Sequence, residues 1–249
     1  MRITGGNAAR RILKVPKGLD VRPTPDLVKQ AVFNSLGVRV AGARVLELFA
    51  GTGALSLECL SRGAVSAVCV EKSSRHAEVL RQNFQVAGFP PETLQVRVQD
   101  VFAAVAQLAA AGERFDLILA DPPYGEKNVG RRSTSFAQQL LDDARLPALL
   151  AAGGLLVLGH TKRDTLSLPD FWEERKILKH GDSLMRFLIA TCEKPAAARE
   201  EPEASQDRRI ARWHIAAART CSPSSPKVVS SRSRCTATSH PTAGPRARP

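Results

Sequence analysis

The stretch that decides the fold reads FDLILADPPYG and covers residues 115–125. Its apolar half is typical of a parallel strand that is buried on both faces of a sheet. Pro122 and Pro123 end this strand, because proline cannot donate to a sheet ladder and fixes its own φ. Asp121 and Tyr124 are therefore expected on a stiff turn at the carboxyl end of a strand, the edge at which open α/β sheets bind ligands.

Strands and helices alternate on both sides of this stretch. The apolar patterns predict strands over residues 44–49, 66–71, 94–98, 154–160, 171–178 and 184–190, and helices over residues 54–62, 74–86, 102–111 and 136–150. Such alternation is typical of a doubly wound, mostly parallel α/β sheet. A tight turn at residues 181–183 makes the last two strands antiparallel, so that a hairpin closes the sheet.

The first 24 residues depart from this pattern and predict a small basic β-hairpin. Two short β-prone pieces, residues 1–6 and 11–16, flank turn-forming residues at 5–7. The segment holds one acid, Asp20, against six basic residues: Arg2, Arg10, Arg11, Lys14, Lys17 and Arg22. Such a ribbon can neutralise nucleic-acid phosphates, although the same charges also suit an edge hairpin that they merely keep soluble.

An amphipathic helix follows the hairpin and is expected to end at Gly37. Thr24 suits the N-cap position, Pro25 the first helical position, and Asp26 complements the helix dipole. The predicted apolar face contains Leu27, Val28, Ala31, Val32, Ser35 and Leu36. We expect this helix to close over the domain that follows.

Charge and composition predict three parts in the 249 residues: the hairpin at 1–24, an α/β domain at 25–194 and a low-complexity basic tail at 195–249. The formal net charge of +12 points to an anionic partner, nucleic acid first. Beyond Asp207 the tail has nine Lys or Arg residues and no acid, a composition typical of disorder. The tail either adds non-specific affinity for RNA or is a dispensable extension.

The five cysteines are an odd number, and no two of them are spaced as Cys-x-x-Cys. This argues against a disulfide framework and a zinc site, and for a reducing compartment. The amino terminus lacks an apolar signal region, and no apolar run approaches about 18 residues. We therefore expect a cytoplasmic protein without a metal or a membrane-spanning segment. We also expect a monomer.

A glycine-rich turn follows the strand at 44–49 and contains Gly51, Thr52 and Gly53. The full dinucleotide-binding pattern needs a third glycine three residues further on, where this chain has Ser56. A pyrophosphate site is therefore less favoured than a cofactor without phosphate, such as S-adenosylmethionine. Glu47 lies beside the turn, and its carboxylate either faces the cationic amino-acid part of such a cofactor, directly or through water, or caps the turn structurally.

Two more acids stand at successive strand ends. Glu71 ends the strand at 66–71, where a carboxylate can accept hydrogen bonds from both ribose hydroxyls. Asp100 follows the strand at 94–98, where it can accept from an adenine amino group. Either acid alone is a weak signal, but three acids at three successive strand ends after a Gly-x-Gly turn are considerably stronger.

The Asp-Pro-Pro-Tyr turn at 121–124 is the most specific signal in the chain. An amino group on a planar base is a poor nucleophile, because its lone pair is delocalised. Asp121 and the Pro122 carbonyl can each accept one N–H of this group, which exposes the lone pair to a methyl sulfonium, while Tyr124 can stack on the base. For His76 and His160 we favour structural roles, since no nucleophile–His–acid arrangement stands out.

These residues resemble the amino-methyltransferases of class I. The turn at 121–124, the stretch Leu48–Leu55 and Val70–Lys72 together match that pattern. The amino terminus is similar to the RsmD family, bacterial enzymes that methylate the guanine N2 of 16S rRNA, through Arg2–Gly6, Pro16–Leu19, Arg22–Asp26 and Phe33–Asn34. The resemblance covers residues 1 to about 192.

This resemblance implies a seven-stranded, Rossmann-like methyltransferase sheet, S-adenosylmethionine as methyl donor and one guanine of assembling small-subunit rRNA as acceptor. It places the basic hairpin on the RNA and the acceptor amino group at Asp121, Pro122, Pro123 and Tyr124. It implies cofactor binding by Glu47, Phe49, Gly51, Gly53, Glu71, Lys72, Asp100 and Asp121. The tail has no counterpart in the family, so the resemblance assigns it no role.

Three other functions stay open at this point. An amino-methyltransferase of DNA adenine or protein glutamine would share the turn at 121–124, but the hairpin and the Arg22–Thr24 junction argue against it. A non-catalytic RNA-binding or ribosome assembly factor is disfavoured, because the motif residues are intact: Asp121, Tyr124, Gly51 and Glu71. A nucleotide-dependent dehydrogenase is disfavoured by Ser56.

Overall fold

The computed structural model describes residues 1–15, 24–124 and 131–191. The chain divides into two compact units, residues 1–199 and 200–249, and all described residues belong to the first. Part of the hairpin segment at 16–23, with Lys17 and Arg22, and the whole tail at 195–249 lie outside the described residues. The proposed boundaries of the α/β domain, at residues 25 and 194, remain predictions.

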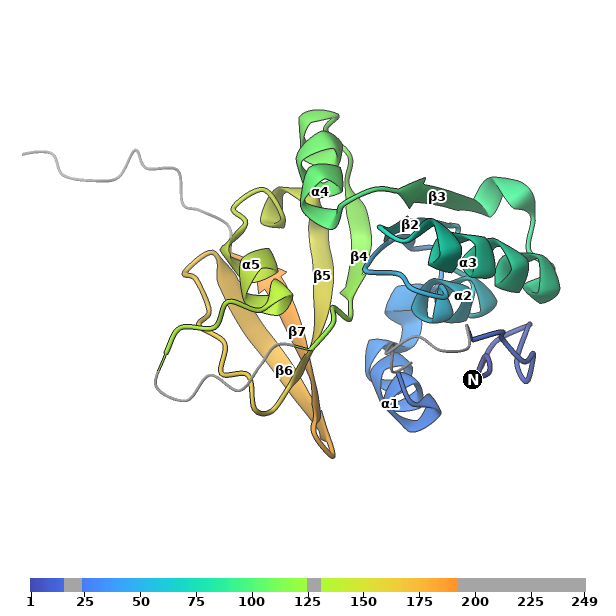
Figure 1. The fold of residues 1–249 in the computed structure, drawn as a ribbon, viewed down its shortest axis with the longest axis horizontal. Helices are drawn as coiled ribbons and strands as arrows, with labels where there is room; N and C mark the ends of the chain where they lie inside the picture. The colour runs from blue at the N-terminus through green and yellow to red at the C-terminus, as the bar shows by residue number, and fades with distance from the viewer. Residues whose placement is uncertain (16–23, 125–130, 192–249) are drawn as a thin grey trace, which may run out of the picture. The chain divides into compact units, whose positions relative to one another are not determined.

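Within the described residues, one seven-stranded sheet has the order β3-β2-β1-β4-β5-β7-β6 (Figure 1). The strands are β1 (Arg44–Leu48), β2 (Ser66–Glu71), β3 (Leu94–Val98), β4 (Phe115–Ala120), β5 (Leu150–Thr161), β6 (Trp172–His180) and β7 (Ser183–Ala190). β1 to β5 are parallel, whereas β7 runs antiparallel to both β5 and β6. The predicted fold, a mostly parallel sheet closed by an antiparallel hairpin, is confirmed.

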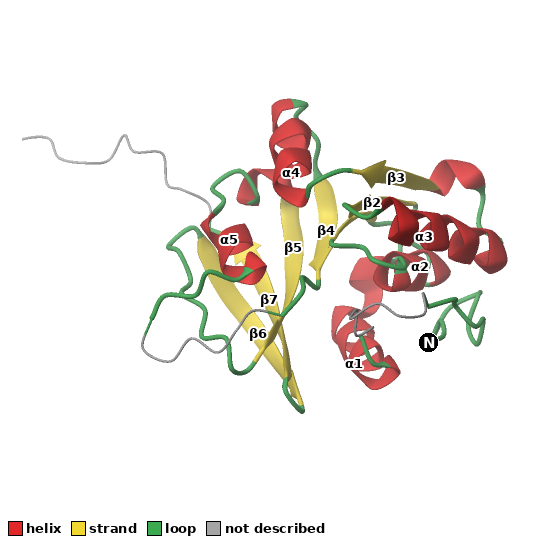
Figure 2. Cartoon of the chain, in the orientation of Figure 1, coloured by secondary structure: helices red, strands yellow, loops and turns green. Residues whose placement is uncertain are grey.

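Helices cover both faces of the sheet (Figure 2). Successive residues of β4 point to opposite faces: Leu117 and Leu119 pack with α1 (Asp26–Leu36), α2 (Ala54–Ser61) and α3 (Ser74–Ala87), and Ile118 and Ala120 pack with α4 (Val101–Ala110) and α5 (Phe136–Asp142). β4 is therefore buried on both faces, as its continuous apolar run predicts. Short 3₁₀ turns lie at Gly37–Val40, Pro91–Thr93 and Pro147–Leu149.

The helix predicted over residues 136–150 is shorter than expected, because α5 ends at Asp142. Pro147 cannot continue a helix, and it opens a 3₁₀ turn instead. This turn still buries Leu149 and leads directly into β5, which begins at Leu150 rather than at residue 154. Apolar periodicity alone did not separate a 3₁₀ turn from the helix that precedes it.

The predicted start of α1 is wrong by one residue: Pro25, expected at the first helical position, is the N-cap residue, and the helix begins at Asp26. No side chain caps this helix, and the hydroxyl of Thr24, the expected N-cap, donates a hydrogen bond to Asp121. The predicted apolar face also differs, because Leu27 is 62% exposed and Lys29 is fully buried. Burial of the Lys29 ammonium is compensated, since Nζ lies 3.1 Å from Asp26 and donates to the Arg2 carbonyl.

The amino-terminal segment forms a short antiparallel ladder that is docked on the domain. Arg2 bridges Ile12, and the Leu13 amide donates to the Met1 carbonyl at 3.0 Å. The ladder is held against α2 by Glu58, which is fully buried and accepts from both the backbone amide and the hydroxyl of Thr4 at 2.7 Å. The hairpin is thus fixed to the domain by buried hydrogen bonds.

Candidate active site

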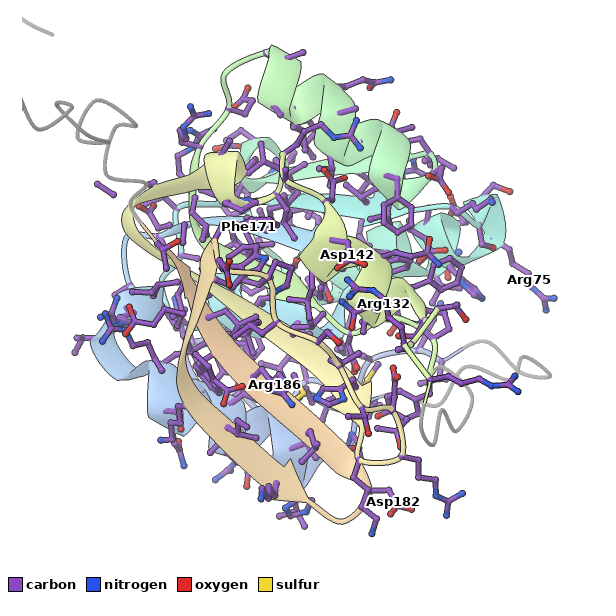
Figure 3. The ribbon with its side chains drawn as sticks, turned by 90° about the vertical axis from the view of Figure 1, so that its left-hand side faces the viewer. Arg75, Arg132, Asp142, Phe171, Asp182 and Arg186 are labelled. Carbon is purple, nitrogen blue, oxygen red and sulfur yellow. The ribbon has the colours of Figure 1, made fainter. Side chains whose placement is uncertain are left out.

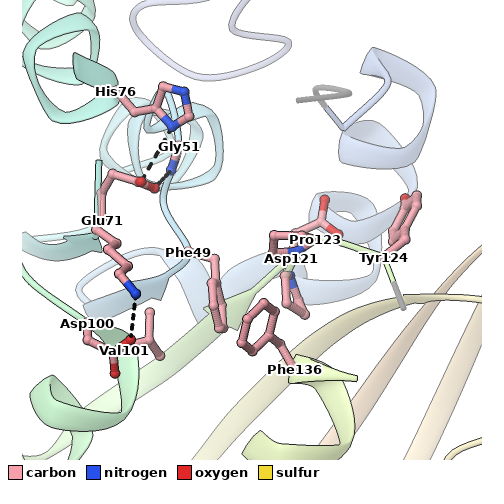
Figure 4. Close-up of a pocket in the computed structure, with 12 residues that line it drawn as sticks. Phe49, Gly51, Glu71, His76, Asp100, Val101, Asp121, Pro123, Tyr124 and Phe136 are labelled. Atoms are coloured by element: carbon pink, nitrogen blue, oxygen red, sulfur yellow. Dashed lines mark hydrogen bonds and ion pairs between the residues drawn. The ribbon is translucent and has the colours of Figure 1, made fainter. Parts of the chain in front are cut away.

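A pocket of about 510 Å³ opens where β1, β2, β3 and β4 end, at the sheet edge that the sequence indicates. This volume lies in the range of about 300–1,000 Å³ typical of small-molecule sites. Its lining comes from several strand ends and helix starts: Phe49, Gly51, Glu71, Lys72, His76, Asp100, Val101, Asp121, Pro122, Pro123, Tyr124 and Phe136 (Figure 4). Most of the residues predicted for cofactor and acceptor binding therefore lie in one cavity.

Glu71 fixes the glycine turn at one end of this pocket. One oxygen of its buried carboxylate accepts from the Gly51 amide at 2.8 Å, and the other accepts from the Ser73 amide at 2.8 Å and lies 3.4 Å from His76 Nδ1 (Figure 4). Gly51 has a φ of +55°, and a Cβ there would meet no atom closer than the Phe49 carbonyl oxygen at 4.0 Å. The absence of a side chain at Gly51 thus leaves room in the pocket for a ligand.

Two of the predicted cofactor residues do not line the pocket. Gly53 has a φ of +75°, and a Cβ there would lie 2.7 Å from Leu80, so this glycine permits close packing of α3. Glu47 is buried, and its carboxylate accepts from the Ser56 amide at 2.9 Å in the first turn of α2. Burial raises the pKa of Glu47 to about 7. Both residues support the glycine turn, and a direct cofactor contact by either stays a prediction.

Asp100 and Lys72 lie at the end of the pocket near β3. Asp100 Oδ1 caps α4 by accepting from the Phe102 amide at 3.0 Å, while its Oδ2 is 3.7 Å from Lys72 Nζ. Asp100 is about half exposed and Lys72 is largely exposed. One carboxylate oxygen of Asp100 therefore has a structural function, and the other faces an exposed ammonium that a ligand can displace.

An aromatic pair separates the acidic end of the pocket from the turn at 121–124. The ring centroids of Phe49 and Phe136 lie 5.5 Å apart (Figure 4). The ring of Phe102 approaches both of them. Phe49 has a φ of +58°, an uncommon backbone conformation for a residue with a Cβ. Only Phe49 was predicted. Phe136 and Val101 were not predicted, and His76 was predicted to have a structural role only.

Asp121 and Tyr124 lie on the opposite side of that pair, each held by a distant partner. Asp121 Oδ2 accepts from the Thr24 hydroxyl at 2.5 Å, and Tyr124 shares a hydrogen bond of 3.0 Å with the Ser183 hydroxyl. Burial raises the pKa of Asp121, and the hydrogen bond from Thr24 partly offsets this effect. Ser183 follows Asp182, which lies at the tip of the β6–β7 hairpin (Figure 3). The Tyr124 ring remains 44% exposed and accessible to a large substrate.

The four described basic residues predicted to bind RNA, Arg2, Arg10, Arg11 and Lys14, do not line the pocket. Arg2 is 3.4 Å from Asp26, Arg11 donates to the Val86 carbonyl at 2.8 Å, and Lys14 Nζ is 3.2 Å from a Gln82 oxygen. Arg10 is exposed. These side chains lie on the surface of the hairpin or reach over the end of α3, and their contact with RNA stays a prediction.

The side chains in the pocket fit a cationic, phosphate-free cofactor. Glu71, Asp100 and Asp121 would repel a pyrophosphate, and carboxylates accept hydrogen bonds from hydroxyl and amino groups. His76 also lines the pocket, and its Nε2 is buried without a hydrogen-bond partner in the part of the chain that the structure describes. A ligand that offers hydroxyl, amino and sulfonium groups therefore suits this set of residues.

Neither of the two cysteines that the structure describes is placed for covalent catalysis. Cys59 and Cys69 are fully buried outside the pocket, and burial raises the pKa of both thiols. His160, predicted to be structural, is buried and accepts from Arg186 at 2.9 Å. Among the described residues no three His, Cys, Asp or Glu side chains are grouped as a metal would require, and no described helix is long and apolar enough to cross a membrane.

The fold and the pocket together define a class I methyltransferase that depends on S-adenosylmethionine. The sequence family described as "Conserved hypothetical protein 95" matches residues 1–189. The chain belongs to this family, the RsmD family of rRNA methyltransferases.

Individual relatives agree with this assignment. YlbH of Bacillus subtilis is 31% identical over 170 residues, which are 68% of this chain and 86% of that protein. The ribosomal RNA small subunit methyltransferase D of Escherichia coli K12 is 35% identical over 124 residues, 50% of this chain and 60% of that protein. A hypothetical protein of Thermus thermophilus superimposes with a TM-score of 0.61 at 33% identity, over 77% of this chain and 99% of that one.

Proposed function

We propose that this protein transfers a methyl group from S-adenosylmethionine to the N2 amino group of one guanine in 16S rRNA. One observation supports this most directly: the turn at 121–124 and the acids Glu71 and Asp100 line a single pocket, on either side of Phe49 and Phe136. A methyl donor bound at the acidic end and a base bound at the turn would meet at these rings. Proximity of this kind is a large part of catalysis in a two-substrate reaction.

The cofactor end binds by hydrogen bonds and charge. The lone pairs that Glu71 does not use on Gly51 and Ser73 accept from the ribose hydroxyls, and the second oxygen of Asp100 accepts from the adenine amino group. Phe49 packs on the adenine ring, and the open side of Gly51 lets the backbone approach the ligand. When bound, S-adenosylmethionine supplies the electrophilic methyl group.

The acceptor end orients the guanine. Asp121 and the Pro122 carbonyl each accept one N–H of the N2 amino group, so that its lone pair points at the methyl carbon. The accessible Tyr124 ring stacks on the base, a contact worth about 1–3 kcal/mol. Asp121 must be ionised to take up the proton that leaves the nitrogen, and its raised pKa makes it a better acceptor for that proton.

The choice of RNA as substrate rests on the family and on charge. The E. coli relative is named a small-subunit rRNA methyltransferase, and the hairpin presents Arg2, Arg10, Arg11 and Lys14 next to the domain. We propose that these side chains, with Lys17 and Arg22, contact phosphates of 16S rRNA in the assembling small subunit. In this proposal a monomer acts in the cytoplasm, without a metal.

Methyl transfer to small-subunit particles from a strain that lacks the enzyme tests the proposal. Particles are incubated with purified protein and methyl-labelled S-adenosylmethionine, and the RNA is then digested to nucleosides. We expect the label in N2-methylguanosine. Label in N6-methyladenosine, or only in protein, would identify one of the other amino-methyltransferase activities and refute this one, and unlabelled RNA and protein would favour a non-catalytic assembly factor.

A further inference from the structure

The strongest unexplained contact in the site is the hydrogen bond between Thr24 and Asp121. Thr24 lies 97 residues before Asp121 in the chain, yet its hydroxyl is 2.5 Å from Asp121 Oδ2. The N-cap residue of α1 is Pro25, which has no side-chain oxygen to offer to the first amides of the helix. The Thr24 hydroxyl, one residue before this cap position, bonds to the acceptor turn instead.

The other carboxylate oxygen of Asp121 is confined from the opposite side. Gly159 lies in β5 next to the end of β4, and a Cβ at this position would lie 2.4 Å from Asp121 Oδ1 and 3.1 Å from Cγ. Any larger residue would push the carboxylate away, unless the backbone moved. The Thr24 hydroxyl at Oδ2 and the Gly159 backbone next to Oδ1 together fix the orientation of the Asp121 carboxylate.

Thr24 is itself held firmly, because the helix that follows is anchored. Val28 and Val32 of α1 are buried in the core. Lys29 joins α1 to the hairpin through Asp26 and the Arg2 carbonyl. The position of the hydroxyl therefore depends on the packing of the whole amino-terminal region, including the basic hairpin.

We propose that Thr24 is a positioning residue for the transfer reaction: its hydroxyl holds Asp121 Oδ2, so that the remaining carboxylate lone pairs are directed at the acceptor amino group. This inference rests on the proposed function, since it assumes that Asp121 accepts an N–H of the acceptor. A carboxylate has about four lone-pair sites, and one hydroxyl occupies a single site. Thr24 thus restricts rotation of Asp121 without saturating it.

Two substitutions separate the hydroxyl from the rest of the side chain. Thr24→Val keeps the shape and removes the donor, whereas Thr24→Ser keeps the donor. Hydrogen bonds to charged groups support a loss of about 10- to 100-fold in kcat for Thr24→Val, with Kd for S-adenosylmethionine unchanged. Thr24→Ser should stay within about threefold of the wild type by the same reasoning. Thr93→Val, which removes an exposed hydroxyl far from the pocket, is the control and should leave kcat unchanged.

The pH dependence of kcat should change if Thr24 positions Asp121, and should not change if Thr24 has a purely structural role. The Thr24 hydrogen bond lowers the pKa of Asp121, so its removal should raise that pKa. Because activity needs the ionised carboxylate, the acid limb of kcat should shift to higher pH in Thr24→Val and stay in place in Thr24→Ser. Carbon-13 NMR of the Asp121 carboxyl measures the same shift without any RNA substrate.

The two kinds of failure are distinguishable. If wild-type protein labels a different nucleoside or none, the proposed function fails, and the NMR titration still tests the contact. The inference itself is overturned if Thr24→Val retains the wild-type kcat and Asp121 titration, or if Thr24→Ser loses as much activity as Thr24→Val.

Discussion

The two turns that build the pocket are stabilised in different ways. The glycine turn is held by acids close in sequence: Glu71 lies 20 residues from Gly51, and Glu47 lies 9 residues from Ser56. The acceptor turn is held from far away, since Thr24 is 97 residues from Asp121 and Ser183 is 59 residues from Tyr124. The cofactor side is thus assembled within neighbouring βα units, whereas the acceptor side needs both ends of the domain.

This difference has a physical consequence for function. The acids at the strand ends can form the cofactor side once β1, β2 and β3 have paired. The acceptor side is complete only when α1 and the β6–β7 hairpin have docked on β4 and β5. We therefore expect substitutions in the acceptor turn and its partners to impair turnover, and substitutions in the glycine turn to impair cofactor affinity.

Asp121→Ala should have the largest effect, because it removes the charged acceptor from the reacting nitrogen. Loss of one preorganised hydrogen bond at a reacting centre costs about 10²- to 10³-fold in kcat. Transfer of labelled methyl groups to small-subunit particles under single-turnover conditions measures this loss. Activity near the wild-type rate would show that Asp121 has no part in the chemistry.

Gly159→Ala should follow, with a loss of about 10- to 100-fold in kcat, since 1 Å of misplacement can cost about 100-fold. The added Cβ would lie 2.4 Å from Asp121 Oδ1, and the carboxylate must move. Single-turnover rates measure the loss, and thermal unfolding checks that the sheet survives. Wild-type turnover in a folded Gly159→Ala protein would mean that the position of Asp121 is not critical.

Gly51→Ala should instead weaken cofactor binding. Gly51 has a φ of +55° and lines the pocket, so the new methyl group is strained and also occupies ligand space. We expect Kd for S-adenosylmethionine to rise about tenfold or more, since each 1.4 kcal/mol of lost ligand contact is about tenfold in Kd. The backbone strain of about 1–2 kcal/mol is shared by the free and bound protein and should appear as lower stability. At saturating cofactor, turnover should recover.

Gly112→Ala is the matched control for Gly51→Ala. Gly112 has a φ of +71° and open space around its Cβ position, and it lies outside the pocket. Both variants should lose similar stability in thermal unfolding, and only Gly51→Ala should lose affinity in calorimetry. If both variants lost the same affinity, the loss would come from destabilisation of the fold and not from a change in the pocket.

Glu47→Gln should change pH dependence more than activity. The pKa of Glu47 rises on folding from 4.5 to about 7, so the folded state binds more protons between these values, and stability falls as pH rises through this window. The loss is on the order of 3 kcal/mol by pH 8. Gln still offers an oxygen to the Ser56 amide and does not ionise. Urea unfolding at pH 5 and pH 8 should show a smaller decrease for Glu47→Gln than for the wild type, and an equal decrease would contradict the assignment.

The sequence predicted those parts of the structure that have a local sequence signal. Glu71, Asp100 and Asp121 stand at strand ends that apolar periodicity marks, and each lies in the pocket. Thr24 was taken for a helix cap, because no local pattern shows that β4 ends beside it. Lys29 was not expected in the core, since its burial depends on the Arg2 carbonyl of another segment.

The same reasoning explains the missed pocket residues. His76 lies in the first turn of α3, and its place beside Glu71 follows from the turn between β2 and α3. Phe136 belongs to α5, which packs against the opposite face of the sheet from α3, and its contact with Phe49 is a tertiary one. A tertiary contact such as that between Phe136 and Phe49 leaves no recognisable spacing in the sequence.

Calorimetry of S-adenosylmethionine with Asp121→Ala tests most directly whether the cofactor side of the pocket is independent of the acceptor side. The cofactor side is assembled by Glu71, Gly51 and Asp100 without help from the acceptor turn. We therefore predict that Kd of Asp121→Ala stays within about threefold of the wild type, because only a single carboxylate at the edge of the cofactor site is lost. An increase of Kd by more than about 30-fold, some 2 kcal/mol, would show that the two sides form one inseparable site.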